Sequence, residues 1–205
     1  MPGGDGPRAG FVLIQRPWNG FARIPEQAMT RSPPEWPDDI FRALRGMDIR
    51  QVAYVPDAGH ARLLDLCGAE PTMTMVPLTT EEEGIAVLAG AWLGGRRGVL
   101  LMQSSGIGNC VNMLSLTRNC RFPLLILVTM RGQPGEANPW QVPMGRISGD
   151  VLGLAGVMVH AVDEPGRVGE TVTAGGRTAF DGPAAVAVLI AQTVVGIKGF
   201  GDQAD

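Results

Sequence analysis

Short runs of apolar residues alternate with amphipathic segments along most of the chain. A continuous apolar run is typical of a strand buried on both faces, whereas apolar residues three to four apart are typical of a helix lying on a sheet. The strongest run is LLILVT at 124–129, which follows Pro123. The pattern predicts strands at 51–55, 73–76, 99–102, 124–129, 158–162 and 184–190.

Helices are predicted between these strands, at 40–47, 61–67, 84–93, 110–119, 148–155 and 166–178. Strands that alternate with helices favour an α/β fold, with three α/β/α layers and a mainly parallel, doubly wound sheet. Ligands of such sheets bind beyond the carboxyl ends of the strands. The polar, glycine-rich loops expected at that edge are 56–60, 79–83, 103–109 and 130–146.

The domain organisation follows from composition. Residues 1–36 are dense in Gly, Pro and Arg, which predicts an extension or an arm laid on a neighbour. One domain is expected at 37–197, with Asp38 as the N-cap of its first helix and a short tail at 198–205.

The most informative stretch is 78–112, LTTEEEGIAVLAGAWLGGRRGVLLMQSSGIGNCVN. Three carboxylates, Glu81 to Glu83, precede a helix of small and apolar residues that another backbone could approach closely. A strand and a polar glycine-rich turn, 103–109, come next. Taken alone, the three carboxylates read as helix-start charges, which the helix dipole favours. Backbone amides of the glycine turn could bind an anion, although a lone GxG is weak support.

These motifs, in this order, resemble the pyrimidine-binding (PYR) domain of thiamine-diphosphate-dependent enzymes over about Pro37 to Ile197. The acidic residue nine positions before Gly90 is Glu81, and S-x-G-x-G-N follows the next strand. Four sequence segments are similar to alpha-type subunits of sulfopyruvate decarboxylase and to the N-terminal part of phosphonopyruvate decarboxylase. They are EEEG, MQSSGIGN, FPLLILVTMRG and NPWQVPMGR.

The resemblance implies a catalytic role for Glu81, whose carboxylate would hydrogen-bond the aminopyrimidine of thiamine diphosphate. Such a carboxylate works best where water is excluded. Glu82 and Glu83 are then expected to be helix-start charges in solvent. Further cofactor-binding residues implied are Asp57, Gly59, Gly106 and Asn109. N-capping of the next helix is an equally good reading of Asn109.

Substrate-binding residues are also implied by the resemblance, namely His60, Gln103, Ser104, Ser105 and Arg131. Arg131 ends the strongest strand and begins a long loop, a natural place for an arginine that clamps an anion. The alternatives are an exposed loop histidine at 60 and an unoccupied surface arginine at 131.

The resemblance covers half of an active site. It implies a separate beta-type subunit that binds most of the Mg²⁺ and the diphosphate, so no metal site is assigned to this chain. The cofactor would be shared between the two chains of a hetero-oligomer. Dimers of this chain through its small-residue helix are also expected. A Gly-Asp-Gly at 4–6 resembles the start of a magnesium motif, but it lacks the preceding strand and the downstream asparagine.

The implied reaction is the non-oxidative decarboxylation of a small 2-oxo acid, with 3-sulfopyruvate giving sulfoacetaldehyde and CO₂ as the favoured case. Phosphonopyruvate or another 2-oxo acid is the nearest alternative. A non-catalytic or regulatory subunit and a flavodoxin-like nucleotide-binding module are the competitors from other classes.

Composition limits the classes of binding partner and the cellular compartment expected for the chain. A net charge of −3 gives no reason to expect nucleic acid or an anionic membrane. No apolar run is long enough to span a bilayer, and the first ten residues lack the apolar core of a signal peptide. Three cysteines without metal-type spacing suit a reducing cytoplasm, and all three are expected to be buried.

Overall fold

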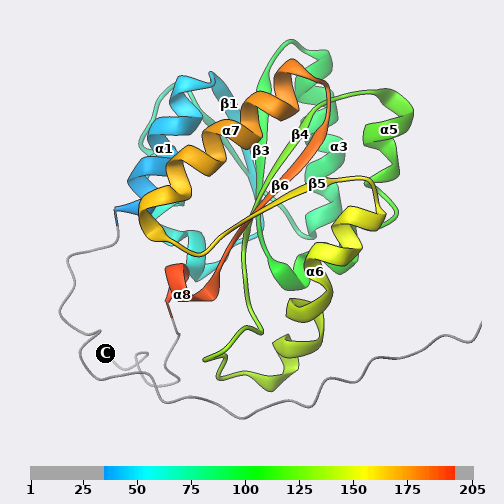
Figure 1. The fold of residues 1–205 in the computed structure, drawn as a ribbon. Coiled ribbons are helices and arrows are strands. Elements are labelled where there is room, and N and C mark those ends of the chain that lie inside the picture. Colours follow the sequence, from blue (N-terminus) through cyan, green and yellow to red (C-terminus); the bar gives the residue numbers. More distant parts are fainter. Residues whose placement is uncertain (1–34, 197–205) are drawn as a thin grey trace, which may run out of the picture.

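The computed structural model describes residues 35–196, in which a single sheet lies between two layers of helices (Figure 1). The strands are β1 (Ile49–Tyr54), β2 (Thr74–Pro77), β3 (Arg97–Gln103), β4 (Leu124–Thr129), β5 (Met158–Val162) and β6 (Ala185–Ile190). They form a six-stranded sheet in the order β2-β1-β3-β4-β6-β5, and every neighbouring pair is parallel. The predicted three-layer α/β fold is confirmed.

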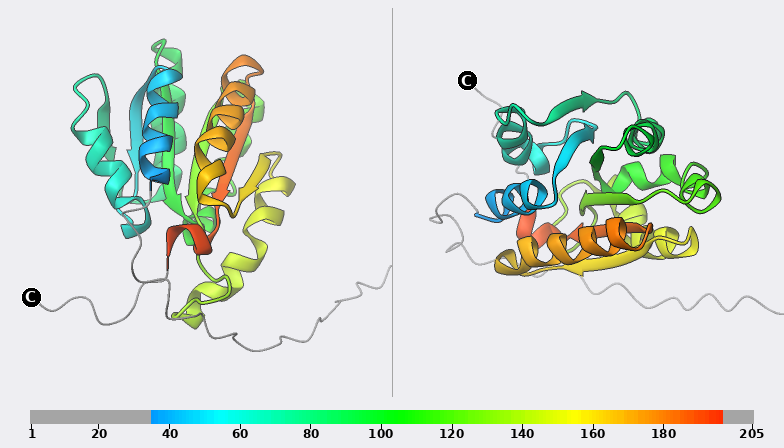
Figure 2. Two further views of the ribbon diagram at one scale, coloured as in Figure 1. Left: turned by 60° about the vertical axis from the view of Figure 1, so that its left-hand side comes forward. Right: turned by 90° about the horizontal axis from the view of Figure 1, so that it is seen from above.

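The helices cover both faces of this sheet, as two views in Figure 2 show. The α-helices are α1 (Trp36–Gly46), α2 (Ala61–Gly68), α3 (Glu81–Leu93), α4 (Ile107–Cys110), α5 (Ser115–Cys120), α6 (Val142–Leu154), α7 (Val168–Asp181) and α8 (Gln192–Val195). The described residues also contain four 3₁₀ turns, η2 (Ala58–His60), η3 (Ser104–Gly106), η4 (Pro139–Gln141) and η5 (Pro165–Arg167). No helix within residues 35–196 has the length and apolar character needed to cross a membrane.

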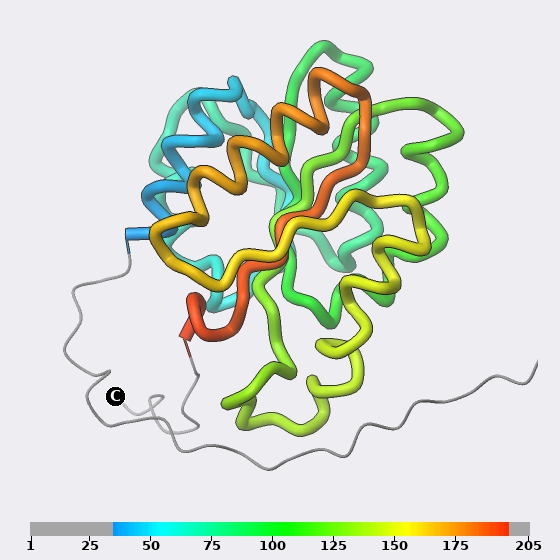
Figure 3. Tube along the Cα trace, viewed as in Figure 1, coloured from blue at the N-terminus to red at the C-terminus, as the bar shows by residue number. Residues whose placement is uncertain are grey.

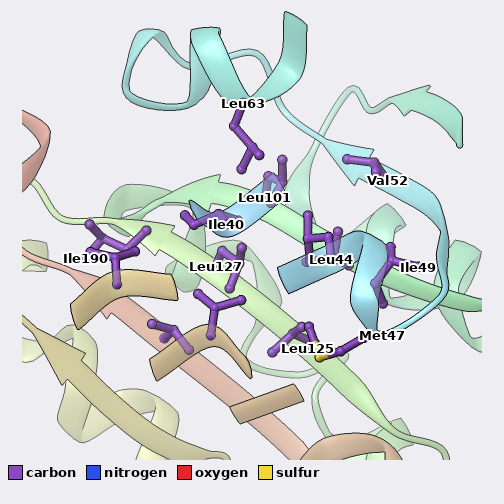
Figure 4. Close-up of a cluster of buried hydrophobic side chains, with 14 of the residues drawn as sticks. Ile40, Leu44, Met47, Ile49, Val52, Leu63, Leu101, Leu125, Leu127 and Ile190 are labelled. Atoms are coloured by element: carbon purple, nitrogen blue, oxygen red, sulfur yellow. The ribbon is translucent and has the colours of Figure 1, made fainter. Parts of the chain in front are cut away.

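Strand β4 shows why the sheet needs both layers. Its six residues are all buried, and successive side chains point to opposite faces. Leu125 and Leu127 pack in a cluster with Ile40 and Leu44 of α1, as Figure 4 shows in close-up. Ile126 belongs to the other cluster, with side chains from α3, α4 and α6. The continuous apolar run therefore fills two cores at once.

Because all strands are parallel, the segments that follow β1, β3 and β4 leave the sheet at one edge, the lower end of the tube in Figure 3. Three of the four loops expected there begin at these strand ends, and the fourth follows β2. The arrangement brings the segments that begin at Val55, Leu78, Ser104 and Met130 to one end of the molecule.

Some local expectations are wrong. Helix α6 begins at Val142 and not at 148, because Pro143 lies in its first turn, where proline has no amide hydrogen to lose from the helix. The loop after β4 is correspondingly shorter than 130–146. The helix expected at 110–119 is split into α4 and α5, since the Ser115 and Leu116 amides donate three residues back in a 3₁₀ pattern.

Asp38 is also not an N-cap, because α1 begins two residues earlier with Glu35 in the cap position. Its carboxylate instead accepts two 2.7 Å hydrogen bonds from Arg62 of α2. Cys67 and Cys110 are buried as expected, whereas Cys120 is exposed at the end of α5. The predicted extension, the Gly-Asp-Gly at 4–6 and the predicted tail fall almost wholly outside the described residues.

Candidate functional site

Glu81 is the first residue of α3 and is 7% exposed. Its carboxylate Oε2 accepts a 2.7 Å hydrogen bond from Nδ2 of Asn109 in α4. A carboxylate at this end of a helix is also stabilised by the helix dipole. Asn109 lies inside α4, whose N-cap position is Gly106, so the N-capping alternative for Asn109 is wrong.

The 103–109 turn lies directly against this carboxylate. A Cβ atom built on Gly106 would be 2.4 Å from Cγ, Cδ and Oε1 of Glu81, closer than any real side chain allows. Position 106 therefore has room only for glycine while Glu81 keeps this conformation. The turn and the start of α3 form one unit around the Glu81 carboxylate.

The other two helix-start carboxylates differ from each other. Glu83 is exposed and accepts a 2.9 Å hydrogen bond from the Thr79 amide. Glu82 is half-buried, and within residues 35–196 its buried Oε2 has no hydrogen-bond partner. The expectation of a solvated helix-start charge holds for Glu83 and is wrong for Glu82.

Cys110 shares the core next to these carboxylates. Burial, and to a smaller extent the nearby Glu81 and Glu82 carboxylates, raise the pKa of its thiol to about 12. The thiol therefore stays protonated near neutral pH. An uncharged thiol is a poor nucleophile, so Cys110 is a packing residue of this site.

A second group of site residues lies at the ends of β1 and β4. Oδ2 of Asp57 accepts hydrogen bonds from the Gly59 amide, at 3.1 Å, and from Oγ1 of Thr129, at 2.7 Å. Gly59 has no room for a side chain, because a Cβ would lie 2.7 Å from Asp57 Oδ2 and 2.9 Å from Thr129 Cγ2. The predicted Asp57 and Gly59 are thus held together with a threonine that was not predicted.

His60 is 1% exposed, so the alternative of an exposed loop histidine is wrong. Its Nε2 lies 3.3 Å from the carbonyl oxygen of Met102, and its buried Nδ1 has no hydrogen-bond partner in the described part of the chain. Burial lowers the pKa of His60, and Asp57 and the Met102 carbonyl offset this only in part. The imidazole is therefore neutral near pH 7, and it would reach a substrate only if the 56–60 segment moved.

The remaining predicted residues lie where β3 and β4 end. Ser104 is fully buried and its Oγ accepts a 3.0 Å hydrogen bond from the Arg131 amide. Gln103 and Ser105 are half-buried, and Oε1 of Gln103 is buried with no partner among the described residues. These three residues directly precede Gly106 in the turn.

Arg131 is not an unoccupied surface arginine. Its Nε and Nη2 each donate a 2.7 Å hydrogen bond to Glu136, whose side chain is 1% exposed. Burial raises the pKa of Glu136, but Arg131 and the amides of Gly132 and Asn138 outweigh burial and lower the pKa to about 2. The pair is charged at any ordinary pH.

Three polar residues of this edge were missed by sequence reasoning: Thr129, Glu136 and Gln192. Thr129 is the one polar residue that closes the apolar run of β4, and Glu136 is the one acidic residue between 130 and 146. Both signals were readable. Gln192 gave no signal, since its role depends on β6 lying beside β4.

A buried carboxylate with one amide donor and a glycine backbone at its side can bind a ring nitrogen through hydrogen bonding, as a pyrimidine would require. The same carboxylate argues against a phosphate cradle in the 103–109 turn, because like charges repel at short range. Within residues 35–196 there is no group of three His, Cys, Asp or Glu side chains that could hold a metal ion.

Residues 36–147 match the family model described as "Thiamine pyrophosphate enzyme, N-terminal TPP binding domain". The chain belongs to this family. The match includes Glu81, Asn109, Gly106 and Arg131, and it agrees with the PYR-type domain expected from the sequence. The resemblance inferred from the motifs is confirmed.

Named relatives of this thiamine pyrophosphate family member are decarboxylases. The chain is 35% identical over 134 residues to the sulfopyruvate decarboxylase subunit alpha of Methanothermobacter thermautotrophicus, covering 65% of this chain and 81% of that one. It is 41% identical over 118 residues to the phosphonopyruvate decarboxylase of Streptomyces viridochromogenes, covering 57% of this chain but only 30% of that enzyme. These names agree with the expected carboxy-lyase subunit that uses thiamine diphosphate.

The fold is also found in a solved structure of 2-oxoglutarate:ferredoxin oxidoreductase from Magnetococcus marinus, with a TM-score of 0.61. The match covers 78% of this chain and 29% of that one, at 15% sequence identity. At this identity the likeness supports the α/β architecture alone.

Proposed function

We propose that this chain is the alpha-type, pyrimidine-binding subunit of a two-subunit, thiamine-diphosphate-dependent 2-oxo acid decarboxylase. The observation that carries the proposal is the Glu81 carboxylate, buried at the start of α3 between Asn109 and the Gly106 backbone. The family match and the names of the relatives support it.

The residues present fit the pyrimidine half of this cofactor. Bound thiamine diphosphate supplies a nucleophilic thiazolium carbon and takes up the electrons released when CO₂ leaves a 2-oxo acid. Glu81 would hold a ring nitrogen of the aminopyrimidine and keep a proton there. Asn109 occupies Oε2 and so orients the carboxylate, which leaves Oε1 for the ring. Gly106 would lie beside the ring, and we assign Asp57 and Gly59, after the end of β1, to cofactor binding as the resemblance implies.

A beta-type subunit would complete the site. The relatives called "subunit alpha" are, by name, parts of larger enzymes. We assign the diphosphate and most of the Mg²⁺ binding to this partner, as the family resemblance implies. Val111, directly after α4, Ile147 in α6 and Trp140 in η4 are 47%, 47% and 81% exposed, and α6 contacts both α4 and η4. They supply the apolar area that the partner would cover.

Self-association of the chain is a separate proposal. On α3, Ala86 and Gly90 are exposed one turn apart and Leu93 is 87% exposed at the helix end. A Cβ on Gly90 would meet no atom within 4 Å, so this face is open to another backbone. Light scattering of the purified chain is expected to give a dimer, and a monomer at all concentrations would contradict this proposal.

We propose 3-sulfopyruvate as the substrate, with sulfoacetaldehyde and CO₂ as products. Two of the relatives above act, by name, on 2-oxo acids that carry a second anionic group. Gln103 and Ser105 at the end of β3 are half-buried, and we assign them to substrate binding as the resemblance implies. Phosphonopyruvate is the second candidate, and pyruvate tests the need for the extra anion.

The decisive experiment uses the chain purified together with its beta-type partner, thiamine diphosphate and Mg²⁺. Aldehyde release from the three 2-oxo acids is measured for the wild type, Glu81→Gln and Glu83→Gln. Glu81→Gln is expected to lower kcat roughly 100-fold or more, the scale of a lost proton-transfer group. Glu83→Gln changes an exposed carboxylate in the same helix turn and is expected to retain activity.

Either competing function would show itself in the same preparation. Full activity in Glu81→Gln would indicate a non-catalytic or regulatory subunit. Tight binding of FMN or a nucleotide by the isolated chain would indicate a flavodoxin-like module instead, although the Glu81 carboxylate beside the 103–109 turn disfavours that reading.

A further inference from the structure

Glu136 is the most heavily hydrogen-bonded side chain at the carboxyl edge of the described sheet. Its two oxygens accept from Nε and Nη2 of Arg131, the amides of Gly132 and Asn138, and Nε2 of Gln192, at 2.7–3.1 Å. It is 5% exposed. A buried carboxylate persists only where donors of this kind replace its water. The loop from 130 to 138 is therefore folded around Glu136.

The same loop is bonded to Gln192, which follows β6, the strand next to β4 in the sheet. The Gln133 amide donates to Oε1 of Gln192 at 3.1 Å, and the Gln192 amide donates to Oε1 of Gln133 at 2.7 Å. Gln192 is the first residue of α8, directly after β6, and is 2% exposed. The loop is thus held internally by the Arg131–Glu136 pair and externally by the bonds of Gln133 to α8.

The Arg131 end of the loop reaches the turn that surrounds Glu81. The Arg131 amide donates to Ser104 Oγ in η3, and η3 ends at Gly106. On the opposite side, the Arg131 carbonyl fills the space where a side chain at Gly145 of α6 would lie, at 2.0 Å from that Cβ position. Arg131 is therefore held between η3 and α6, and its backbone position sets that of Ser104.

Arg131 itself is poorly placed to clamp a substrate in this conformation. Two of its three guanidinium nitrogens donate to Glu136, and its side chain is 16% exposed. Its contribution to the edge comes through its backbone amide, which the Glu136 pair keeps facing Ser104. The arginine predicted from the sequence to bind an anion is already bound to an internal one.

We propose that Glu136 is a positioning residue for the Glu81 site: through Arg131 and Ser104 it holds η3, and with it Gly106, against the catalytic carboxylate. The inference rests on the proposed decarboxylase function for its effect on rate. Its structural half, the restraint of η3 by Glu136, is measurable on the chain alone. A failure of one half is therefore distinguishable from a failure of the other.

The first test measures amide hydrogen exchange by mass spectrometry on the full chain. Glu136→Gln is expected to speed exchange in peptides covering 103–110 and 130–138 at least 10-fold more than in β1 and β6, whose exchange reports the loss of global stability. Glu70→Gln is the matched control, because Glu70 also pairs with an arginine, Arg45, and accepts the Thr72 amide, but lies in the turn between α2 and β2. Unchanged exchange at 103–110 would overturn the proposal.

Ser104→Ala tests the link between the two segments. It removes the acceptor of the Arg131 amide and leaves every Glu136 contact in place. Exchange is expected to rise in 103–110, while the Gly132 and Asn138 amides stay protected. If 103–110 stays as protected as in the wild type, the connection does not run through Ser104 and the proposal is wrong.

The second test uses the complex with the beta-type partner. Glu136→Gln is expected to lower kcat about 10-fold with KM within twofold, for 3-sulfopyruvate and pyruvate alike. Added to Glu81→Gln, it is expected to lower kcat no further, since both act on one carboxylate. A rise in KM confined to the sulfonate substrate would instead make Arg131 a substrate clamp and overturn the positioning role. An inactive wild-type complex would refute the proposed function. The restraint of η3 by Glu136 would then be tested by hydrogen exchange alone.

Discussion

Nδ2 of Asn109 lies 2.7 Å from Oε2 of Glu81, and the two residues are 28 positions apart in the chain. The contact joins the start of α3 to α4 across the end of β3. It fixes Oε2 of the carboxylate at the start of α3, while Oε1 lies against Gly106.

Asn109→Asp is expected to be more harmful than Asn109→Ala. The alanine loses one charge-assisted hydrogen bond, and a loss of kcat of roughly 10- to 150-fold corresponds to the 1.5–3 kcal/mol such a bond contributes. The aspartate places a second negative charge against Glu81 and displaces its carboxylate. Steady-state kinetics of the complex with the partner subunit measure both. Asn112→Ala, an exposed asparagine just beyond α4, serves as control, and equal effects for the two Asn109 variants would contradict the charge argument.

Gly106→Ala is expected to abolish most activity while the chain still folds. The new methyl group would lie 2.4 Å from Glu81 atoms, and relieving such a contact costs about 1–3 kcal/mol of folding free energy. Gly108→Ala is the matched control two residues away, where the nearest atom to a new Cβ is Met144 Sδ at 4.0 Å. Urea unfolding and activity are measured together. A Gly106→Ala chain with wild-type activity would show that Glu81 does not need its observed position.

His60 is expected to make the chain less stable as the pH falls. The folded-state pKa of His60 is lowered from 6.5 by burial, so the unfolded chain binds the proton more readily. Stability is then fully present above pH 6.5 and declines as the pH falls below it. His60→Leu is expected to flatten the dependence of unfolding free energy on pH between 7 and 5, whereas exposed His160→Gln should leave it unchanged. Parallel curves for the wild type and His60→Leu would refute this.

Protonation of Glu136 in the Glu136–Arg131 pair is expected to destabilise the chain at acidic pH. The pKa of Glu136 is lowered to about 2 from 4.5. The stabilisation is complete above pH 4.5 and is lost as the pH falls from there toward 2, by on the order of 3 kcal/mol.

At pH 7, Glu136→Gln is expected to cost about 3–5 kcal/mol because Arg131 is left unpaired. Adding Arg131→Met should cost little more, which a double-mutant cycle by urea unfolding measures. Strictly additive losses would mean that the two side chains do not interact.

Most of the architecture was predictable because it depends on local patterns. The run at 124–129 had to be a central strand, since only burial on both faces suits six such residues. Helix α6 was misplaced by six residues because Pro143 looks the same in a loop as in the first turn of a helix. Local sequence carries no information that separates these two cases.

The candidate site was predicted unevenly for a related reason. Glu81, Gly106 and Asn109 lie in one continuous motif, so a resemblance could find all three, and the structure brings them together. The environment of Arg131 was not predictable, because its partner Glu136 is buried only once the loop is closed against Gln192. His60 looked like a loop residue, and only the 3₁₀ turn η2 carries its ring inward against Met102.

The absence of space at Gly106 has a practical consequence for redesign of substrate scope. A library that randomises position 106 or 81 would contain mostly inactive variants, because the Glu81 side chain fills the space beside Gly106. Pro134 and Ala137 are exposed on the loop that Glu136 organises, and their side chains are free to vary without disturbing that anchor. We therefore expect substitutions that adapt the enzyme to 2-oxo acids of different size and charge to be tolerated best at these two positions.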